Sequence, residues 1–196
     1  VVVGAGYIGL EVASVATNLG IEVSIIEMAN RVMNRTVDPI ISSYYHKLHE
    51  NHGVKIYLAN GLKEFQGKNS VDKVLCSDGL ELEADLVVVG AGVLPNQEIA
   101  SNAGLECDNG IMVNEFGETS DKNVYACGDC TNHPNKSLGT RLRLESVHNA
   151  MEQSKTVANS IMGNKNPYNQ IPWFWSDQYD HKLQLVGISG EHDEVI

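Results

Sequence analysis

The sequence predicts an α/β fold built on a doubly wound parallel sheet, and three observations support this prediction. An apolar run of valines opens the chain and leads through a glycine-rich turn, GAGYIG, into an amphipathic stretch. Short β-branched runs then alternate with a second helical stretch. A later apolar run, DLVVVGAG, enters another glycine turn, as buried parallel strands do. This alternation indicates a Rossmann-like domain with a small antiparallel excursion.

The elements of this first part follow from local patterns. Amphipathic stretches that stop at a glycine predict two helices: residues 7–19 and 38–52. Asp38 is a typical N-cap, and Pro39 suits the first turn of the second helix. Asp78-Gly79 predicts the turn of a hairpin. Apolar or β-branched runs predict four strands: residues 1–3, 22–27, 54–59 and 85–92.

The pattern changes after about Asn109. Two short strands are expected, GIMVN and NVYAC, and the second ends at Cys127. A loop rich in Asn, Pro and Lys follows, and a long helix is expected from about Glu145 to Met162. The last segment, IPWFWSDQYDHKLQLVGISG, has the character of strands and is expected to belong to another domain.

Composition narrows the class of protein. The chain has 196 residues and a formal net charge of −11 at pH 7. The acidic balance argues against a general nucleic-acid binder, and no apolar run approaches the ~20 residues of a membrane span. Four cysteines without a signal-peptide pattern are typical of a reducing, cytoplasmic setting. Because the chain begins inside a strand without Met and stops soon after a strand-like run, we expect an internal piece of a longer protein.

The GAGYIG turn has the glycine spacing of a dinucleotide site. Gly4, Gly6 and Gly9 follow an apolar strand and open a helix, and Glu27 ends the next strand. In this context Gly4 permits the tight turn, Gly6 lets the backbone approach a pyrophosphate, and Gly9 lets the helix pack on the strand. The helix N-terminus offers partial positive charge to phosphates. The alternative is a glycine turn without a nucleotide.

Glu27 is expected to accept hydrogen bonds from the adenine ribose hydroxyls, and its charge would repel a 2′-phosphate. We therefore predict NADH over NADPH, a preference that nearby Arg31 weakens without reversing. The second glycine turn, at Gly90, is expected at the same carboxyl edge of the sheet, where ligands bind in such folds. By itself this second turn is equally compatible with a structural turn that ends a strand and binds no ligand.

VYACGDC places Cys127 and Cys130 in a Cys-x-x-Cys spacing. Such a pair can be a redox disulfide, half of a zinc site or chemically silent. A zinc site needs a second pair of ligands, and neither Cys76 nor Cys107 supplies one at a suitable spacing. A redox pair typically opens a helix, whereas this pair ends an apolar run and enters a loop.

Four separated motifs resemble those of a known family: VVVGAGYIGLE, TSDKNVYACGDC, RLESVHNAMEQSKTVANSIMG and PWFWSDQYD. In this order they resemble FAD-dependent pyridine nucleotide-disulfide oxidoreductases that feed electrons to ferredoxins, the putidaredoxin and rubredoxin reductase group. The resemblance covers essentially the whole chain. It implies an NAD-binding domain (1–110), the second segment of an FAD-binding domain (111–168) and the truncated start of an α+β C-terminal interface domain (169–196).

The resemblance also assigns roles in the second glycine-containing motif. Asp129 is expected to accept a hydrogen bond from the ribityl chain of FAD, with Gly128 allowing close approach and the cysteines acting as packing neighbours. The helix that begins near Ser146 is expected to point its positive end at the flavin. A backbone N–H near Val147 would then reach a ring carbonyl.

Glu11 and Glu145 match family positions near the nicotinamide carboxamide and the flavin edge, so they are the expected catalytic residues. They would orient the nicotinamide for hydride transfer and not act as acids or bases. Trp173 and Trp175 alternate on one face of the last strand, on a path to the partner, although interface packing is an equal alternative. The expected cofactor-binding residues are Gly4, Gly6, Tyr7, Ile8, Gly9, Glu27, Arg35, Gly90, Gly128, Asp129, Ser146, Val147, Trp173 and Trp175.

Two other groups of residues invite a functional interpretation. Three histidines recur every third residue on the second helix: His46, His49 and His52. This spacing drifts around the helix, so a solvated face is favoured over a metal site. The densest basic stretch in the acidic chain consists of Lys136, Arg141 and Arg143. We expect it to help dock an acidic ferredoxin, with ordinary solvated charge as the alternative.

The sequence as a whole predicts an NADH-dependent FAD flavoprotein reductase of an oxygenase electron-transfer chain. The resemblance implies that electrons pass from NADH through FAD to a ferredoxin- or rubredoxin-type iron–sulfur protein, and no metal site is expected. The alternatives are an NADH oxidase or flavin disulfide reductase of the same superfamily, or a regulatory flavoprotein that binds NADH. Because the family's first FAD-binding glycine motif is not in this sequence, the piece alone is expected to be inactive.

Overall fold

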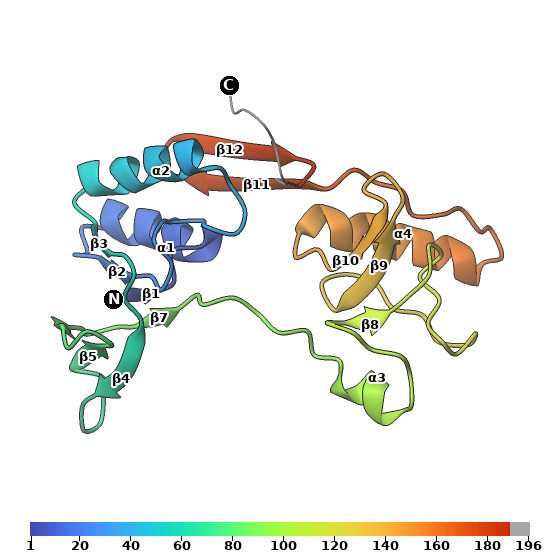
Figure 1. Cartoon of the computed structure of the whole chain (residues 1–196), viewed down its shortest axis with the longest axis horizontal. Coiled ribbons are helices and arrows are strands. Elements are labelled where there is room, and N and C mark those ends of the chain that lie inside the picture. Colours follow the sequence, from blue (N-terminus) through green and yellow to red (C-terminus); the bar gives the residue numbers. More distant parts are fainter. Residues whose placement is uncertain (189–196) are drawn as a thin grey trace. The chain divides into compact units, whose positions relative to one another are not determined.

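The computed structural model describes residues 1–188 (Figure 1). Contacts divide them into two compact units. Unit 1 holds residues 1–92 and 176–183, and unit 2 holds residues 93–175 and 184–188. The domain boundaries expected near residues 110 and 168 stay predictions.

The expected parallel sheet forms the centre of unit 1. Its four strands are β1 (Val2–Val3), β2 (Ser24–Ile26), β3 (Lys55–Tyr57) and β7 (Val88–Val89). They run parallel in the order β3-β2-β1-β7, so the strand order reverses beside β1. Ligands of open α/β sheets bind at this reversal point, outside the carboxyl ends of the strands.

Two helices lie on one side of this sheet (Figure 1). α1 (Tyr7–Asn18) buries a stripe that includes Leu10 and Ala13. α2 (Pro39–Asn51) buries a stripe of one helix face: Ser42, Tyr45 and His49. Both helices confirm the periodicity of the sequence, and α2 begins at the predicted Asp38-Pro39 pair.

A small antiparallel sheet lies on the other side (Figure 1). It consists of β4 (Leu62–Gln66), β5 (Lys73–Cys76) and β6 (Glu81–Glu83). The β5–β6 turn is the predicted one: Gly79 has φ +94°, and the Leu80 N–H donates to Asp78 Oδ1 at 2.9 Å. The buried residues shared by the two sheets are Val3, Ile26, Val74, Cys76, Leu82 and Ala84. The antiparallel excursion is therefore what closes the core on this side.

Unit 2 is built around another three-stranded sheet and a long helix. The sheet has the order β10-β9-β8, with β8 parallel and β10 antiparallel to β9. Its strands are β8 (Ile111–Met112), β9 (Thr131–Asn135) and β10 (Thr140–Leu142), and the helices are α3 (Glu98–Asn102) and α4 (Val147–Ile161). α4 confirms the long helix that the sequence predicts.

The expectation of a strand at NVYAC is wrong. Tyr125 makes only an isolated bridge with Glu118, and no strand is assigned around it. An apolar run becomes a strand only where a neighbour supplies a ladder of hydrogen bonds. Among the described residues, the segment beyond Gly128 forms that ladder instead.

The expected loop after Cys130 is also wrong, because it forms the β9–β10 hairpin. The polar side chains of β9 are largely buried. Several of these side chains have hydrogen-bond partners, which lowers the cost of their burial. Asn132 Nδ2 donates to the carbonyl of Asp108 at 2.7 Å, and Asn135 Oδ1 accepts the Leu138 N–H at 3.0 Å in the turn.

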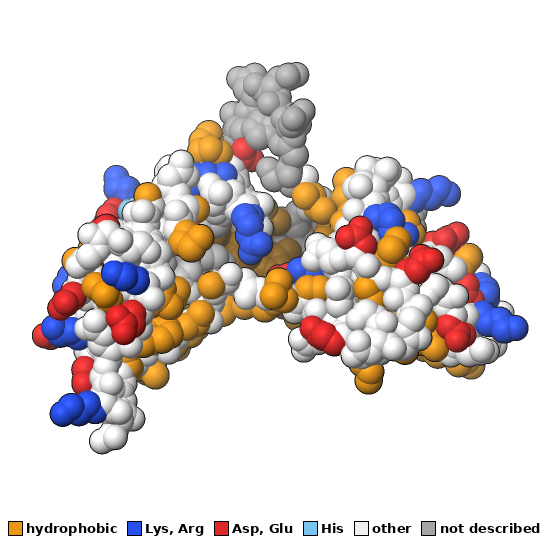
Figure 2. Space-filling model, turned by 60° about the horizontal axis from the view of Figure 1, so that its bottom comes forward, with side chains coloured by type: hydrophobic (Ala, Val, Ile, Leu, Met, Phe, Trp, Pro, Cys, Tyr) orange, Lys and Arg blue, Asp and Glu red, His pale blue; other side chains and the backbone are white. Residues whose placement is uncertain are grey.

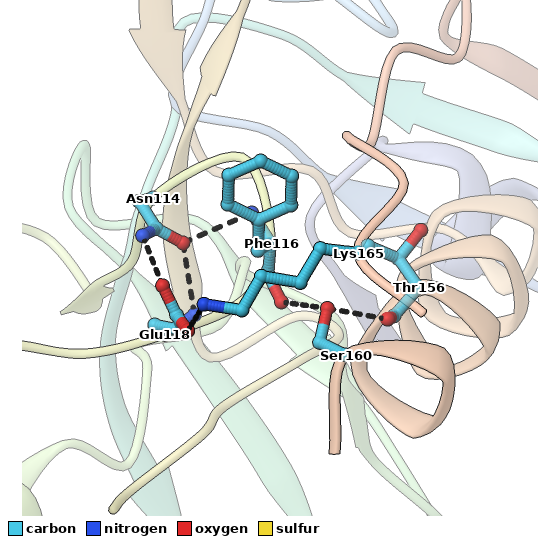
Figure 3. A network of polar contacts seen from close by, with 6 residues as sticks. All are labelled: Asn114, Phe116, Glu118, Thr156, Ser160 and Lys165. Carbon is cyan, nitrogen blue, oxygen red and sulfur yellow. Dashed lines mark hydrogen bonds and ion pairs between the residues drawn. The ribbon is translucent and has the colours of Figure 1, made fainter. Parts of the chain in front are cut away.

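A polar network ties the loop after β8 to the far end of α4 (Figure 3). Asn114 Oδ1 accepts the N–H groups of Phe116 and Glu118, at 2.9 and 3.1 Å. Lys165 pairs with the Glu118 carboxylate, and its Nζ lies 5.6 Å from the centre of the Phe116 ring. Ser160 Oγ lies 3.0 Å from the Phe116 carbonyl oxygen. These contacts fix the C-terminal end of α4 within unit 2.

The last described elements are β11 (Trp173–Gln178) and β12 (His181–Val186), which form a two-stranded sheet. They confirm the strand character expected of this segment, whose residues 189–190 lie outside the described range. The turn of this hairpin belongs to unit 1. There the Tyr179 N–H donates to Ser14 Oγ of α1 at 2.8 Å.

Figure 2 shows hydrophobic side chains at the surface of both units, among interspersed charges of both signs. The most exposed include Leu86 and Met28 in unit 1, and Leu94 and Ile99 in unit 2. Within residues 1–188, no helix is long and apolar enough to cross a membrane.

Candidate functional site

Two glycines allow the β1–α1 turn to pack closely at the point where the strand order reverses. Gly4 has φ +98°, and a Cβ there would lie 2.5 Å from the carbonyl oxygen of Gly90. A Cβ on Gly9 would lie 2.0 Å from the carbonyl oxygen of Gly4. Since real Cβ contacts are not this short, α1 can approach β1 this closely only with glycine at both positions.

Gly6 differs from its two neighbours in the motif. It is the N-cap of α1, with φ −76°, and no side chain caps the helix there. A Cβ on Gly6 would meet no atom within 4 Å. The space beside Gly6 is therefore open, and it lies at the positive end of the α1 dipole, which attracts anions.

Glu27 follows β2 and is held beside the glycine turn by two backbone groups. Its Oε2 accepts the Ala5 N–H at 2.7 Å, and its Oε1 accepts the Ala29 N–H at 2.7 Å. Each oxygen keeps a second lone pair, so the carboxylate can still accept hydrogen bonds from ribose hydroxyls.

Arg31 points its guanidinium into its own loop. Its two terminal nitrogens donate to the carbonyls of Val37 at 2.7 Å and Asn34 at 2.9 Å. Those contacts hold the positive charge in place near Glu27 without an ion pair to it. Arg31 is therefore less available to attract the 2′-phosphate of NADPH.

The second glycine turn lies directly beside the first. The Gly90 N–H donates to the carbonyl of Val3 at 2.7 Å. Gly92 has φ +95°, and a Cβ there would lie 3.4 Å from a guanidinium nitrogen of exposed Arg35. The structure thus brings Gly90 and Arg35 to the same edge of the sheet as Gly4.

Three further predicted residues lie on the first turns of α1. Ile8 is 61% exposed. Burial raises the pKa of Tyr7, and a hydrogen bond with Thr36 opposes that shift. Glu11 Oε1 accepts a hydrogen bond from Ser176 Oγ of β11 at 2.6 Å.

In unit 2, Gly128 and Asp129 precede β9 in a tight turn. Gly128 has φ +83°, and its N–H donates to Gln153 Oε1 of α4 at 2.7 Å. The Asp129 carboxyl is near the surface, where partial burial and then Glu145 raise its pKa, while Arg143 and the Ser146 N–H lower it. An acceptor carboxyl therefore stands beside the start of α4.

The two cysteines around Asp129 are free and half-buried. Cys130 Sγ donates to the carbonyl of Cys127 at 3.6 Å. Burial raises the pKa of the Cys127 thiol, and Cys130 adds to the effect. A raised pKa disfavours the thiolate that redox or zinc chemistry needs. Over residues 1–188, no group of His, Cys, Asp and Glu side chains has the arrangement of a metal site.

Ser146 caps α4. Its side chain accepts the Asn149 N–H at 3.1 Å, so one of the free N–H groups of the first turn is satisfied. Val147, the first helical residue, is 56% exposed. Glu145 precedes the cap and pairs with Arg143 at 2.7 Å. The start of α4 is thus ordered and accessible.

The tryptophans of β11 lie near this helix start. Trp173 and Trp175 have ring centroids 5.0 Å apart and so share a face, as the alternation predicts. The ring of His148, in the first turn of α4, lies edge-on to Trp173 at 5.8 Å. Within unit 2 the structure therefore gathers Asp129, the α4 N-terminus and the tryptophan pair into one region.

The histidines of α2 show what sequence reasoning missed. The expectation of a solvated face is wrong for His49, which is fully buried and contacts Gln178 at 2.9 Å. His46 lies 3.3 Å from Glu50, and His52 stacks on Tyr179 with centroids 3.7 Å apart. The signal was present in the apolar stripe of α2, because His49 continues it by one helical turn.

The basic stretch of unit 2 is largely occupied by internal contacts. Arg141 donates to the carbonyls of Val113 at 2.8 Å and Asn132 at 2.6 Å. Arg143 is held by Glu145. Lys136 and Arg141 are both exposed overall, and docking of a partner at this stretch stays a prediction.

The chain matches two protein-family profiles. Residues 1–154 match the pyridine nucleotide-disulphide oxidoreductase family, and residues 173–196 match the reductase C-terminal family. The first match covers well over half of the chain. The chain belongs to the pyridine nucleotide-disulphide oxidoreductase family.

Relatives within the pyridine nucleotide-disulphide oxidoreductase family match the whole chain. Putidaredoxin reductase of Pseudomonas putida is 42% identical over 199 residues, 100% of this chain and 47% of that protein. The crystal structure of the ferredoxin reductase for the CYP199A2 system of Rhodopseudomonas palustris has a TM-score of 0.95 and 45% identity, over 100% of this chain and 48% of that one. The crystal structure of the covalent putidaredoxin reductase–putidaredoxin complex has a TM-score of 0.93 and 43% identity, over 98% of this chain and 47% of that one.

These comparisons confirm the resemblance and the α/β fold predicted from the sequence. The chain spans about half the length of the curated relatives it matches.

Proposed function

We propose that the complete protein is an NADH-dependent FAD flavoprotein reductase that passes electrons to a ferredoxin- or rubredoxin-type iron–sulfur protein. The observation that carries the proposal is the open glycine turn at Gly6 beside Glu27. It stands in a chain matched along its whole length by reductases of putidaredoxin and ferredoxin. FAD, when bound, supplies the chemistry that accepts a hydride from NADH and releases electrons one at a time.

The first unit would bind NADH. The pyrophosphate would lie in front of Gly6, where backbone can approach it and the α1 dipole attracts it. Glu27 would accept from the ribose hydroxyls, and its charge disfavours the 2′-phosphate of NADPH. Gly90 and Arg35 would line the same edge, with Tyr7 and Ile8 on the first turn of α1. NADH is therefore the proposed donor.

The second unit would bind FAD. Asp129 would accept from the ribityl chain, where the left-handed turn at Gly128 lets the backbone come close. The N–H near Val147 would donate to a ring carbonyl, and the dipole of α4 would stabilise negative charge there. Trp173 and Trp175 would shield the ring edge on the side of the partner.

Glu11 and Glu145 would orient the nicotinamide and not exchange protons. Their carboxylates accept from Ser176 and Arg143, respectively, so each is held in one orientation. Orientation of the nicotinamide over the flavin lowers the entropy cost of hydride transfer. The cysteine pair would take no part, since burial raises the pKa of Cys127.

We also propose a cytoplasmic location, because NADH is the donor and all four cysteines are free thiols. The partner would be steered by charge to exposed Lys136 and its surroundings. Arg141 and Arg143 would shape that surface through their internal contacts.

The deciding experiment uses the full-length protein. Its flavin spectrum is recorded, it is titrated with NADH and NADPH, and turnover is measured with a plant-type ferredoxin or a rubredoxin as acceptor. A bound flavin that NADH reduces, with rapid turnover of the iron–sulfur acceptor, is expected. Fast reduction of oxygen or of a disulfide substrate, with slow reduction of either acceptor, would overturn the proposal.

A further inference from the structure

A chain of hydrogen bonds leads from Glu11 on α1 into the β11–β12 turn and on to α2. Ser176 Oγ lies 2.6 Å from Glu11 Oε1, and Gln178 Nε2 lies 3.0 Å from Ser176 Oγ. Gln178 Oε1 lies 2.9 Å from His49 Nε2, and His49 Nδ1 lies 3.1 Å from the Tyr179 hydroxyl. All five side chains belong to unit 1. Ser176, Gln178 and His49 are fully buried.

The direction of the first two bonds follows from the count of donors. An ionised carboxylate only accepts, so the Ser176 hydroxyl must donate its one hydrogen to Glu11. Ser176 then has only lone pairs left for Gln178. The Gln178 amide must therefore present its NH₂ group to Ser176.

The direction of the remaining bonds follows in turn. With its NH₂ group toward Ser176, Gln178 presents its carbonyl oxygen to His49, so His49 Nε2 must carry the proton. A buried imidazole is favoured in its neutral form, which leaves Nδ1 as an acceptor. The Tyr179 hydroxyl, which also contacts the Thr17 side chain, can therefore donate to Nδ1.

We propose that Tyr179, His49, Gln178 and Ser176 are positioning residues, whose one-directional hydrogen-bond chain fixes the Glu11 carboxylate at the nicotinamide site. Only one part of this proposal, the role of Glu11 at the nicotinamide, rests on the proposed function. From Glu11 to His49 each side chain has one way to satisfy its partners, so this part of the hydrogen-bond chain has a single low-energy arrangement. It also makes the geometry of Glu11 depend on the segment 176–179, which docks on α1 and α2 from far along the sequence.

The aromatic contacts of the turn strengthen the far end of the chain. The Tyr179 ring stacks on His52 at 3.7 Å and lies 5.0 Å from His49. Tyr179 has φ +57°, a left-handed conformation that is uncommon for a bulky residue. The hydrogen bonds of its N–H to Ser14 and of its hydroxyl to His49 hold it there.

The first test reads the tautomer of His49 directly. Histidine side chains of the full-length protein are labelled with ¹⁵N, the His49 signals are assigned by their loss in His49→Gln, and long-range ¹H–¹⁵N correlations are recorded at pH 7. The Nε2–H tautomer is expected. An Nδ1–H tautomer or an imidazolium would contradict the proposed hydrogen-bond directions, and this result does not depend on which ligands the protein binds.

The second test asks whether the chain acts through Glu11. The rate of flavin reduction by NADH and the Kd of NADH are measured for Ser176→Ala, Glu11→Gln and the double variant. Ser176→Ala is expected to slow reduction about tenfold, as for the loss of one hydrogen bond to a charged group. The double variant should be no slower than Glu11→Gln, because Ser176 has no other route to the nicotinamide. If the double variant slows flavin reduction by the product of the two single effects, the proposal is overturned.

The last test compares Tyr179, at the end of the hydrogen-bond chain, with Tyr44, a tyrosine of α2 that is not part of it and serves as the control. Tyr179→Phe removes only the terminal hydroxyl and should shift the His49 signals and slow reduction, with less effect than Ser176→Ala. Tyr44→Phe removes a hydroxyl from a half-exposed ring and should change neither. If Glu11→Gln leaves reduction and binding unchanged while His49 shows the expected tautomer, the proposed role of Glu11 fails and the hydrogen-bond chain stands as a structural device only.

Discussion

The two helices that are expected to face cofactors begin in different ways. α1 starts at Gly6 without a side-chain cap, and a Cβ there would meet open space. α4 starts at Ser146, whose hydroxyl accepts the Asn149 N–H. An uncapped start leaves N–H groups for an external anion, whereas a capped start keeps fewer of them free. The difference suits a charged pyrophosphate at α1 and a neutral ring carbonyl at α4.

What surrounds each start differs too. At α1 the neighbours are two glycine turns, and each oxygen of the Glu27 carboxylate accepts one backbone N–H. At α4 the neighbours are Asp129, Glu145 and Arg143, whose charges oppose one another. Backbone shape therefore defines the first site, while side-chain charge defines the second. Substitutions that separate shape from charge test this contrast.

The largest effect is expected for Gly9→Ala. A methyl group 2.0 Å from the Gly4 carbonyl oxygen forces α1 away from β1. Overpacking of this kind costs about 1–3 kcal/mol or more, so a marked fall in the unfolding midpoint and loss of NADH binding are expected. Gly6→Ala is the matched control: it meets no atom, so it should unfold normally and weaken only NADH binding. Equal unfolding midpoints for the two variants would contradict the assignment.

At the second site the charge of Asp129 is the feature to remove. Asp129→Ala in the full-length protein should cost most of the bound FAD, because the acceptor for the ribityl chain is lost. The flavin content of the purified protein, read from its absorption spectrum, measures the change. The double variant Cys127→Ala, Cys130→Ala should retain flavin and activity. Loss of turnover in the double variant with flavin retained would give the cysteines a redox role.

A buried histidine in the sheet of unit 2 predicts that the stability of this unit depends on pH. His133 is 1% exposed, and burial, followed by the positive charge of Arg141, lowers its pKa to about 4. Since the unfolded chain, with a pKa near 6.5, binds more protons between those values, stability should fall as pH drops through that window.

The expected loss between pH 7 and pH 5 is on the order of 2 kcal/mol. Denaturant unfolding at several pH values, followed by a probe in unit 2, measures it. His133→Phe should flatten the slope. His49, whose pKa burial also lowers, adds a slope of the same sign in unit 1. An unchanged slope in His133→Phe would show that the pKa of His133 is not lowered in the folded protein.

The sequence was a good guide where one local pattern decides the structure. Glycine spacing, the Asp38-Pro39 start and the Asp78-Gly79 turn all depend on residues near one another, and they were predicted. β9 was missed because its polar side chains are buried by partners that lie far along the chain, such as Asp108. The burial of His49 was missed for the same reason, since Gln178 is 129 positions away.

Glu27 tests whether charge matters at the site that shape defines. Glu27→Ala should lower the preference for NADH over NADPH, because the repulsion of the 2′-phosphate and the ribose hydrogen bonds disappear together. The ratio of kcat/KM for the two nucleotides measures this. Arg31→Ala is the control and should change the ratio little, since its guanidinium is bound to Val37 and Asn34. An unaltered ratio in Glu27→Ala would remove Glu27 from the nucleotide site.

The smallest effect is expected at the cap of α4. Ser146→Ala removes the acceptor of the Asn149 N–H and should destabilise unit 2 by about 1 kcal/mol. The freed N–H adds to the positive end of the helix, so any anion near Val147 would be bound no more weakly than before. Flavin content should therefore stay near that of the parent protein while the unfolding midpoint falls. Loss of flavin in Ser146→Ala, at temperatures where the protein remains folded, would show that the serine itself contacts the cofactor. Ser154→Ala, on the exposed side of α4, is the control for a serine that caps nothing.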